Sequence, residues 1–222
     1  MKYFDPDFLL FFKELAANNH KEWFDQNRKR YEKSVKKPFE NFVADLLEES
    51  RQLDPTISAP AKDCIFRINR DIRFSKDKTP YKLERSAIIS EKGRKDHSSP
   101  GFYIALGPEH ISVGGGAYFF KKEQLATVRQ QMASNPKKIN TLTADASFVK
   151  LFGELKGEEN KRLSKELAEA AETQPLLFKK QLYYMTTLDP ALVETDDLMP
   201  TILKHFSAGA PISAYLKDTI SK

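Results

Sequence analysis

The stretch "SAIISEKGRKDHSSPGFYIALGPEHISV", residues 86–113, decides the fold class. Its three short apolar runs, "SAIIS", "FYIAL" and "HISV", are separated by a polar loop and by the tight connection "LGPEH". Neither connection is long enough to hold the crossover helix that a parallel pair of strands needs. The stretch therefore predicts three consecutive strands, 86–90, 102–106 and 110–113, in an antiparallel sheet.

The segments on both sides of this stretch show the periodicity of helices. Apolar residues recur at helical spacing over 8–15 and 39–47, and Asp5 and Asn19 are candidate N-caps. After the strands we expect a helix over 121–134, short helices after Asn135 and Leu163, a late strand at the sheet edge in "KKQLYYMTTLD" (179–189), and a closing helix capped by Thr195 or Asp196.

Helices, a meander and further helices form the pattern of an α+β fold. We predict N-terminal helices, a central antiparallel β-meander, and C-terminal helices packed on the sheet. With 40% hydrophobic residues the chain can bury a sizeable core. No linker clearly divides the sequence, so we predict a single domain over residues 1–222.

Composition excludes several classes of protein. No run of about 18 apolar residues is present, so we expect no membrane span. The N-terminus shows no signal-peptide pattern, and we expect a cytoplasmic protein. The single cysteine, Cys64, excludes an intramolecular disulfide and a cysteine-based zinc cluster. It is a candidate nucleophile, although its apolar neighbours favour a buried thiol.

Positive charge is concentrated in one segment. Residues 62–85 contain 8 cations and 4 anions, so they carry +4 of the net charge of +5. Residues 65–74 alternate as a strand does, so we predict a further strand here. One of its faces would be apolar except for Arg70, and the other would display Arg67 and Arg73 roughly 20 Å apart. An extended polyanion could contact both arginines, whereas a small anion would need the chain to bend or would bind between Arg73 and the next loop.

That loop, "SKDKTPYK" (75–82), adds ammonium and hydroxyl donors in one turn. Guanidinium and ammonium groups bind phosphate and carboxylate. The candidate anion-binding residues are Arg67, Arg70, Arg73, Lys76, Lys78, Tyr81 and Lys82. The alternative is that the arginines form salt bridges with the acidic residues of the same segment and hold the turn.

Two other groups are candidates for the same site. Gly114, Gly115 and Gly116 could offer backbone N–H groups to a phosphate, although they match no phosphate-loop motif and could instead form a bulge or twist at the strand end. If they bind the anion, they should face the basic segment. Trp23, Asn27 and Tyr31 share one helix face and are candidates for a pocket wall, with core packing as the alternative.

Catalytic chemistry is not specified by any motif. The four histidines show no metal-binding spacing, and we predict no metal and no cofactor. Asp71, Asp77 and His97 are candidates for acid–base or metal roles if the protein is an enzyme, which the sequence leaves open.

Four stretches together resemble the domain of unknown function 2461 family, and the resemblance covers nearly the whole chain. They are "NNHKEWFDQNRKRYEKSVKKPFE" (18–40), "FRINRDIRFSKDKTPYK" (66–82), "PGFYIALGPEHISVGGGAY" (100–118) and "LATVRQQM" (125–132). The resemblance implies a single α+β domain and a soluble intracellular protein, and it brings no established reaction, cofactor or substrate.

The leading functional hypothesis is therefore binding of a phosphate-bearing or other anionic ligand, a nucleotide or nucleic acid, through the basic segment. The alternatives are an enzyme of phosphoryl or hydrolytic type in the same pocket and a structural or partner-binding module without a ligand. The polar loop 91–101 is a candidate lid, and the sequence makes no prediction about the oligomeric state.

Overall fold

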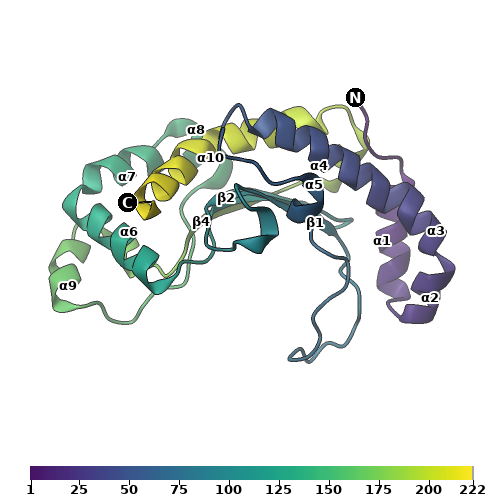
Figure 1. Ribbon diagram of the computed structural model, residues 1–222, viewed down its shortest axis with the longest axis horizontal. Coiled ribbons are helices and arrows are strands. Elements are labelled where there is room, and N and C mark those ends of the chain that lie inside the picture. Colours follow the sequence, from purple (N-terminus) through teal and green to yellow (C-terminus); the bar gives the residue numbers. More distant parts are fainter. Residues whose placement is uncertain (222) are drawn as a thin grey trace.

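A four-stranded antiparallel sheet lies at the centre of this computed structural model, which describes residues 1–221 (Figure 1). The strands lie in chain order across the sheet, so the predicted meander is confirmed and the predicted late strand pairs with its edge. Their bounds are β1 (Arg85–Ile89), β2 (Gly101–Leu106), β3 (Ile111–Ala117) and β4 (Leu182–Leu188).

Helices precede and follow the meander, which confirms the predicted α+β class. The N-terminal helices are α1 (Asp7–Ala17), α2 (Lys21–Gln26), α3 (Arg28–Arg30), the π-helix η1 (Tyr31–Lys36), α4 (Lys37–Ser50) and α5 (Ala61–Cys64). The later ones are α6 (Lys122–Ser134), α7 (Pro136–Thr143), α8 (Ala146–Phe152), α9 (Lys165–Ala171) and α10 (Leu198–Ile220), with short 3₁₀ turns at Gly93–Lys95, Pro175–Phe178 and Pro190–Glu194.

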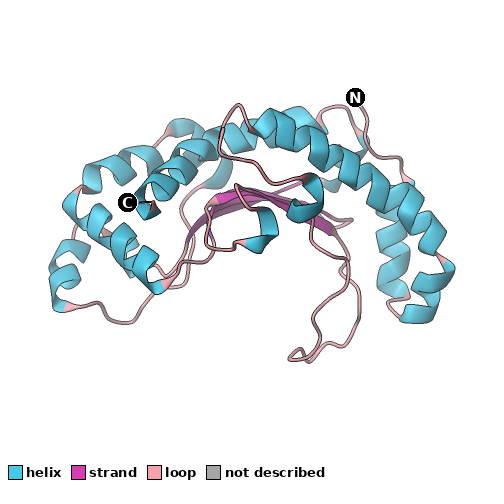
Figure 2. Ribbon diagram, in the orientation of Figure 1, coloured by secondary structure: helices cyan, strands magenta, loops and turns pink. Residues whose placement is uncertain are grey.

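Two long helices, α4 and α10, cover one face of the sheet (Figure 2). On this covered face Phe102 stacks on Phe206 of α10, with ring centroids 4.4 Å apart. Ile104 and Val113 beside them are fully buried. Since alternate residues of a strand point to opposite faces, the covered face takes one half of each strand into the core.

Tyr184 determines how closely β3, β4 and α10 approach one another. Its hydroxyl shares a hydrogen bond of 2.8 Å with Ser213 Oγ of α10. A Cβ atom at Gly115 would lie 2.5 Å from the Tyr184 hydroxyl oxygen, and one at Gly209 would lie 2.3 Å from the same side chain. Glycine at both positions therefore makes room for the tyrosine.

The other face of the sheet, which we call the open face, has loops beside it. Figures 1 and 2 show α4 and α10 on one side of the sheet and further helices at its two ends. By strand register, Ile88, Tyr103, Gly114 and Met185 form one row across the open face. Residues 66–84, which we call the projecting loop, extend away from the sheet on this side (Figure 1).

The prediction of a strand over 65–74 is wrong. Only isolated bridges form there, Ile65 with Ala87 and Asn69 with Tyr81. Beyond the first bridge the chain leaves the edge of β1 and folds back on itself, so no neighbouring strand accompanies it. The residues expected on the apolar face of this strand do not share one environment, because Ile68 is buried while Phe74 is 95% exposed.

Three predicted caps differ from the structure. The residue before α1 is Pro6, and the side chain of Asp5 accepts from the backbone N–H of Asp7 at 3.0 Å. The residue that caps α2 is His20, whose Nδ1 accepts from the backbone N–H of Trp23, and Asn19 has another role described below. The closing helix α10 begins after Asp197, one residue beyond the nearer of the two predicted caps.

Among residues 1–221, no helix is both long and apolar enough to cross a membrane.

Candidate functional site

The base of the projecting loop is anchored to the helices and to β1. The side-chain amide of Asn19 donates to the carbonyl of Tyr81 and its oxygen accepts from the Tyr81 N–H, at 3.0 and 3.1 Å. The Tyr81 ring stacks on Phe24 at 4.1 Å. Buried Arg85 donates to the carbonyl of Phe66 at 2.9 Å. These contacts fix both ends of the loop, so its middle part projects from a rigid base.

Internal bonds also hold the far part of the loop. Arg70 forms an ion pair with Asp77 and a hydrogen bond with the Thr79 hydroxyl. Arg73 forms an ion pair with Asp71 at 2.7 Å. The salt-bridge alternative therefore describes these two arginines, whose charges are largely matched within the loop.

The pKa values of both aspartates follow from these contacts. Hydrogen bonds from the Thr79 backbone, from Arg70 and from the Thr79 hydroxyl lower the pKa of Asp77 to about 2. The Arg73 guanidinium, together with the Arg73 backbone N–H, lowers the pKa of Asp71 to about 2. Both carboxylates are therefore ionised and engaged, and neither is poised to exchange a proton near neutral pH.

The remaining cations of the segment differ from these two arginines. One N–H of the Lys78 ammonium donates to the carbonyl of Ile72 at 2.8 Å. This hydrogen bond does not balance the positive charge of Lys78, because a carbonyl is neutral. Lys76 and Arg67 are exposed. Within residues 1–221, neither Arg67 nor Lys82 has a carboxylate within ion-pair distance, in contrast to the paired Arg70 and Arg73.

Lys82 has an unusual environment for an unpaired lysine. Its ammonium lies 5.1 Å from the centre of the Phe66 ring, and the side chain is half-buried. Burial lowers the pKa of Lys82, and the nearby charges of Arg85 and Arg67 act in the same direction, while Glu84 opposes them. An anion that approached Lys82 and Arg67 would relieve this repulsion.

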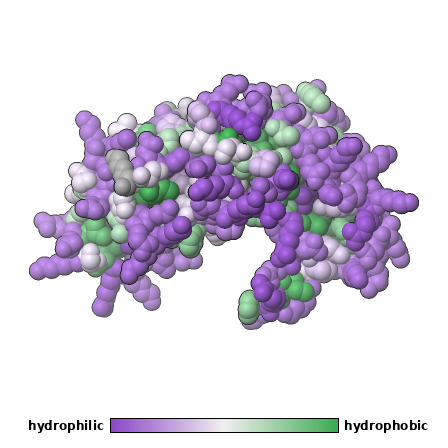
Figure 3. All heavy atoms as spheres, in the orientation of Figure 1, coloured by the Kyte–Doolittle hydropathy of each residue, from purple (hydrophilic) through white to green (hydrophobic). Residues whose placement is uncertain are grey.

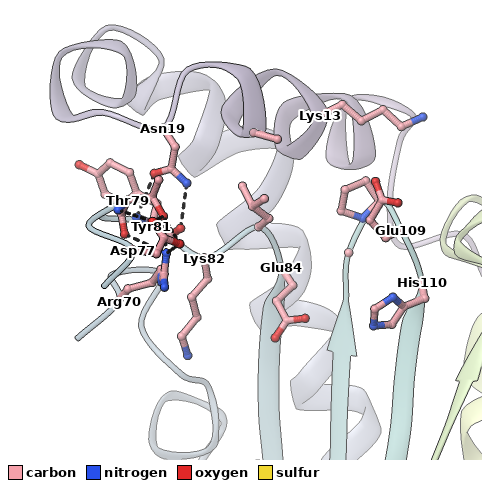
Figure 4. Close-up of a pocket in the computed structure, with 14 residues that line it drawn as sticks. Lys13, Asn19, Arg70, Asp77, Thr79, Tyr81, Lys82, Glu84, Glu109 and His110 are labelled. Atoms are coloured by element: carbon pink, nitrogen blue, oxygen red, sulfur yellow. Dashed lines mark hydrogen bonds and ion pairs between the residues drawn. The ribbon is translucent and has the colours of Figure 1, made fainter. Parts of the chain in front are cut away.

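Lys82 also lines a cavity of about 710 Å³ at the end of the sheet (Figure 4). The cavity lies between α1, the projecting loop and the connection from β2 to β3. Figure 4 shows Lys82 and Glu84 extending in the same direction from the chain that leads into β1. The polar lining of this cavity includes both cationic and anionic side chains: Lys13, Arg70, Asp77, Lys82, Glu84, Glu109 and His110.

A second cavity, of about 610 Å³, lies on the open face. Its lining includes the aromatic residues Phe66, Tyr103, Tyr118, Phe119 and Tyr183. Tyr118 and Tyr183 meet edge to face with centroids 5.1 Å apart, and Phe66 lies 6.5 Å from Tyr103. The ammonium of Lys82, which lines the first cavity, lies 5.1 Å from the centre of the Phe66 ring, so an unpaired cation contacts one wall of the aromatic cavity.

Tyr103 connects the aromatic cavity with the charged end of β1. Burial, and then the charge of Glu84, raise the pKa of Tyr103 to about 12. Its hydroxyl is therefore protonated at neutral pH and can donate a hydrogen bond. His97, a candidate for acid–base chemistry, also lines this cavity, whereas Asp71 and Asp77 belong to the loop.

The three glycines lie in β3, which pairs with β2 on one side and β4 on the other. Gly115 and Gly116 line the aromatic cavity together with Phe66, so they do face one end of the basic segment. The backbone groups of these glycines belong to a strand that is paired on both sides. Close neighbours such as Tyr184 leave no room for a Cβ atom, which explains why glycine occupies these positions. We therefore infer that these glycines shape the cavity.

The candidate wall on the N-terminal helices is located elsewhere. Tyr31 is buried and packs on Phe11, Trp23 packs on the same ring, and Asn27 donates to the Trp23 carbonyl. None of Trp23, Asn27 and Tyr31 lines either cavity. These contacts match the core-packing alternative.

No further cluster in the described chain suggests redox or metal chemistry. Cys64 is buried, and burial raises the pKa of its thiol to about 11. Among residues 1–221, no three His, Cys, Asp or Glu side chains come together as a metal ion requires.

The aromatic residues of the open face were not among the sequence candidates. Their signal was present in "FYIAL", "AYFF" and "LYYM", where aromatic residues occupy successive positions of a strand and its end. A strand that is apolar on both faces usually has both faces buried. Here one of the two faces is accessible, with Tyr118 71% and Phe119 52% exposed.

The comparisons with known proteins give a family and no activity. A family model described as "Conserved hypothetical protein (DUF2461)" matches residues 7–215. No curated protein matches the sequence.

Proposed function

The chain belongs to the DUF2461 family of conserved hypothetical proteins, and we propose that it binds a phosphate-bearing ligand with a flat base on the open face of its sheet. The ligand class is a nucleotide or a stretch of nucleic acid. The observation that carries this proposal is an aromatic cavity whose lining ring Phe66 lies against the ammonium of Lys82, a cation without a carboxylate partner among residues 1–221.

The aromatic lining supports the flat part of the ligand. Exposed tyrosine and phenylalanine rings on an antiparallel sheet are suited to stacking on bases, and each stacked base contributes about 1–3 kcal/mol. Tyr118, Phe119 and Tyr183 provide accessible rings from the end of β3 and from β4. A cavity of about 610 Å³ lies within the range typical of small-ligand sites.

The charges support the phosphate part. Arg67 and Lys82 lie close enough for the charge of Arg67 to lower the pKa of Lys82, so both contribute to one positive region. Charge-assisted bonds to phosphate are stronger than neutral ones, and half-burial of Lys82 reduces screening by water. Arg70 and Arg73 are left out of the contacts we propose, because each already binds an aspartate.

The test is binding of AMP, of a labelled single-stranded oligonucleotide and of a labelled duplex over a salt series. The variant is Arg67→Ala with Lys82→Met, which removes both unpaired charges. The matched control is Lys137→Ala with Lys150→Ala, since these exposed lysines lie on α7 and α8, away from the open face (Figure 1).

We expect the site variant to weaken binding about tenfold or more and to reduce the slope of affinity against salt by about two contacts, because each phosphate contact releases counterions. The control should match the wild type after allowance for net charge. Absence of binding by the wild-type protein to all three probes at about 50 mM salt would overturn the proposal.

A further inference from the structure

The end of the projecting loop exposes an aromatic side chain to solvent. Phe74 is 95% exposed, the most exposed large apolar residue in residues 1–221. Figure 3 shows apolar atoms at the end of this loop beside hydrophilic ones. A fully exposed phenylalanine gains no stabilisation from burial, so its ring is free to contact a partner.

The loop presents this ring from a structure held by its own bonds. The Arg73–Asp71 pair and the Lys78 bond to the Ile72 carbonyl hold the chain on both sides of Phe74. The Arg73 guanidinium lies 5.8 Å from the centre of the Phe74 ring. A ring that is already positioned loses little conformational entropy when a partner binds.

The charges around the ring indicate the chemistry of the partner. Lys76 and Lys78 are exposed cations within four residues of Phe74, and neither has a carboxylate within ion-pair distance among residues 1–221, whereas Arg73 is paired with Asp71. A single ring beside two unpaired cations fits a chain of phosphates with flat bases between them. Lipid attachment usually requires a larger apolar surface, such as the whole face of an amphipathic helix or an acyl chain.

We propose that Phe74 stacks on a base of a single-stranded polynucleotide that also occupies the open face, so that the ligand is a polymer. This inference rests on the proposed function. The loop extends from the open-face side of the sheet, so one strand can reach both surfaces (Figure 1). Phe66 and Phe74 are eight residue steps apart, so they are separated by at most roughly 26–29 Å, which corresponds to about eight nucleotides at a stacked rise of about 3.4 Å.

The test asks whether the increase in affinity with ligand length depends on the Phe74 ring. Affinities for thymidine monophosphate and for oligothymidylates of about 4, 8 and 12 nucleotides are measured with the wild type, Phe74→Ala, Phe74→Trp and Leu83→Ala. Leu83 is the control because it is an exposed large apolar residue near the base of the same loop. Circular dichroism verifies the fold of each variant, which these exposed substitutions should leave intact.

We expect wild-type affinity to rise between the short and long oligonucleotides. Phe74→Ala should weaken binding of the 12-mer about tenfold, the effect of one lost stacking contact, and leave binding of the monophosphate unchanged. Phe74→Trp should retain the increase in affinity with oligonucleotide length, and Leu83→Ala should bind as the wild type does.

Each contrary result has a distinct meaning. Equal affinity for all lengths, or no effect of Phe74→Ala on the 12-mer, overturns the inference while binding of the monophosphate upholds the proposed function. No binding of any probe overturns both. A Phe74-dependent association with vesicles containing phosphatidylserine, without oligonucleotide binding, assigns the loop to a membrane surface and overturns the inference.

Discussion

Tyr183 and Tyr184 are adjacent residues of β4 that point to opposite faces of the same sheet. Tyr184 is fully buried, between Phe148 and Phe152, and its hydroxyl bonds to Ser213. Tyr183 remains partly accessible. The same side chain thus serves the core on one face and is available to a ligand on the other, and what separates the two roles is whether helices cover the face.

The largest difference between the faces should appear when each tyrosine is shortened. We expect Tyr184→Ala to lower the free energy of unfolding by about 3–5 kcal/mol, because it empties a packed site, and Tyr183→Ala to lower it by about 1 kcal/mol or less. Urea denaturation measures both. Tyr183→Ala should instead weaken ligand binding, and an equal loss of stability in the two variants would contradict the comparison.

The next test removes a single hydrogen bond from the covered face. Tyr184→Phe leaves Ser213 Oγ buried without this partner, and we expect a loss of about 1–2 kcal/mol in the free energy of unfolding. Ser213→Ala should cost a similar amount. The double variant should be more stable than the sum of the two losses predicts, and strict additivity in a thermal or urea melt would show that the bond contributes nothing.

A smaller effect is expected in the projecting loop, where Asp77 holds Arg70 and Thr79. The pKa of Asp77 in the folded protein, about 2, lies below its usual value of 3.8, so its contribution is present above about pH 4 and is lost as the pH falls toward 2. Asp77→Asn should mimic the low-pH state at neutral pH.

Amide hydrogen exchange measures this change. The Thr79 N–H donates to Asp77 at 2.9 Å, so its exchange should accelerate in Asp77→Asn while the amides of β3 remain unchanged. The matched control is Asp45→Asn, which removes a carboxylate from α4 at a distance from the loop. Unchanged exchange at Thr79 would show that the loop does not depend on this carboxylate.

The smallest effect concerns Lys82 at the margin of the open face. Because burial lowers its pKa, labelling of the Lys82 amine should reach its midpoint at a pH below the ordinary range of a lysine. Binding of a phosphate ligand favours the charged amine, so the ligand should move this midpoint upward. Mass spectrometry of labelled peptides follows Lys82 alone, and a midpoint in the ordinary range would argue against the environment described for it.

The strands were predictable because two independent signals agree on them. In 86–113 the apolar runs are bounded by turn residues, and the short connections allow one topology. The run over 65–74 has a similar alternation, and it failed because alternation predicts extended chain without showing whether a neighbouring strand is present. Here the charges of Arg70 and Arg73 are satisfied within the loop, so the segment is held without a sheet partner.

The site was predictable only in part, for the same kind of reason. The concentration of charge marked the segment that the proposal uses, and Arg67 and Lys82 remain in that proposal. Which arginine meets which aspartate depends on the path of the loop, which a linear sequence does not specify. The aromatic cavity was missed because exposure of one face of β2–β4 depends on where distant helices pack.

The pairing of β3 with β4 also has a consequence for the order of folding. Residues 118–181 lie between these neighbouring strands, so β4 closes a much longer stretch of chain than the tight turns of the meander do. Contacts this distant in sequence form slowly. During synthesis β1–β3 can pair while the edge of β3, with its three glycines, is still without a partner. An unpaired edge can join another chain, so until residues 182–188 emerge from the ribosome, we expect this edge to be open to pairing with a neighbouring chain.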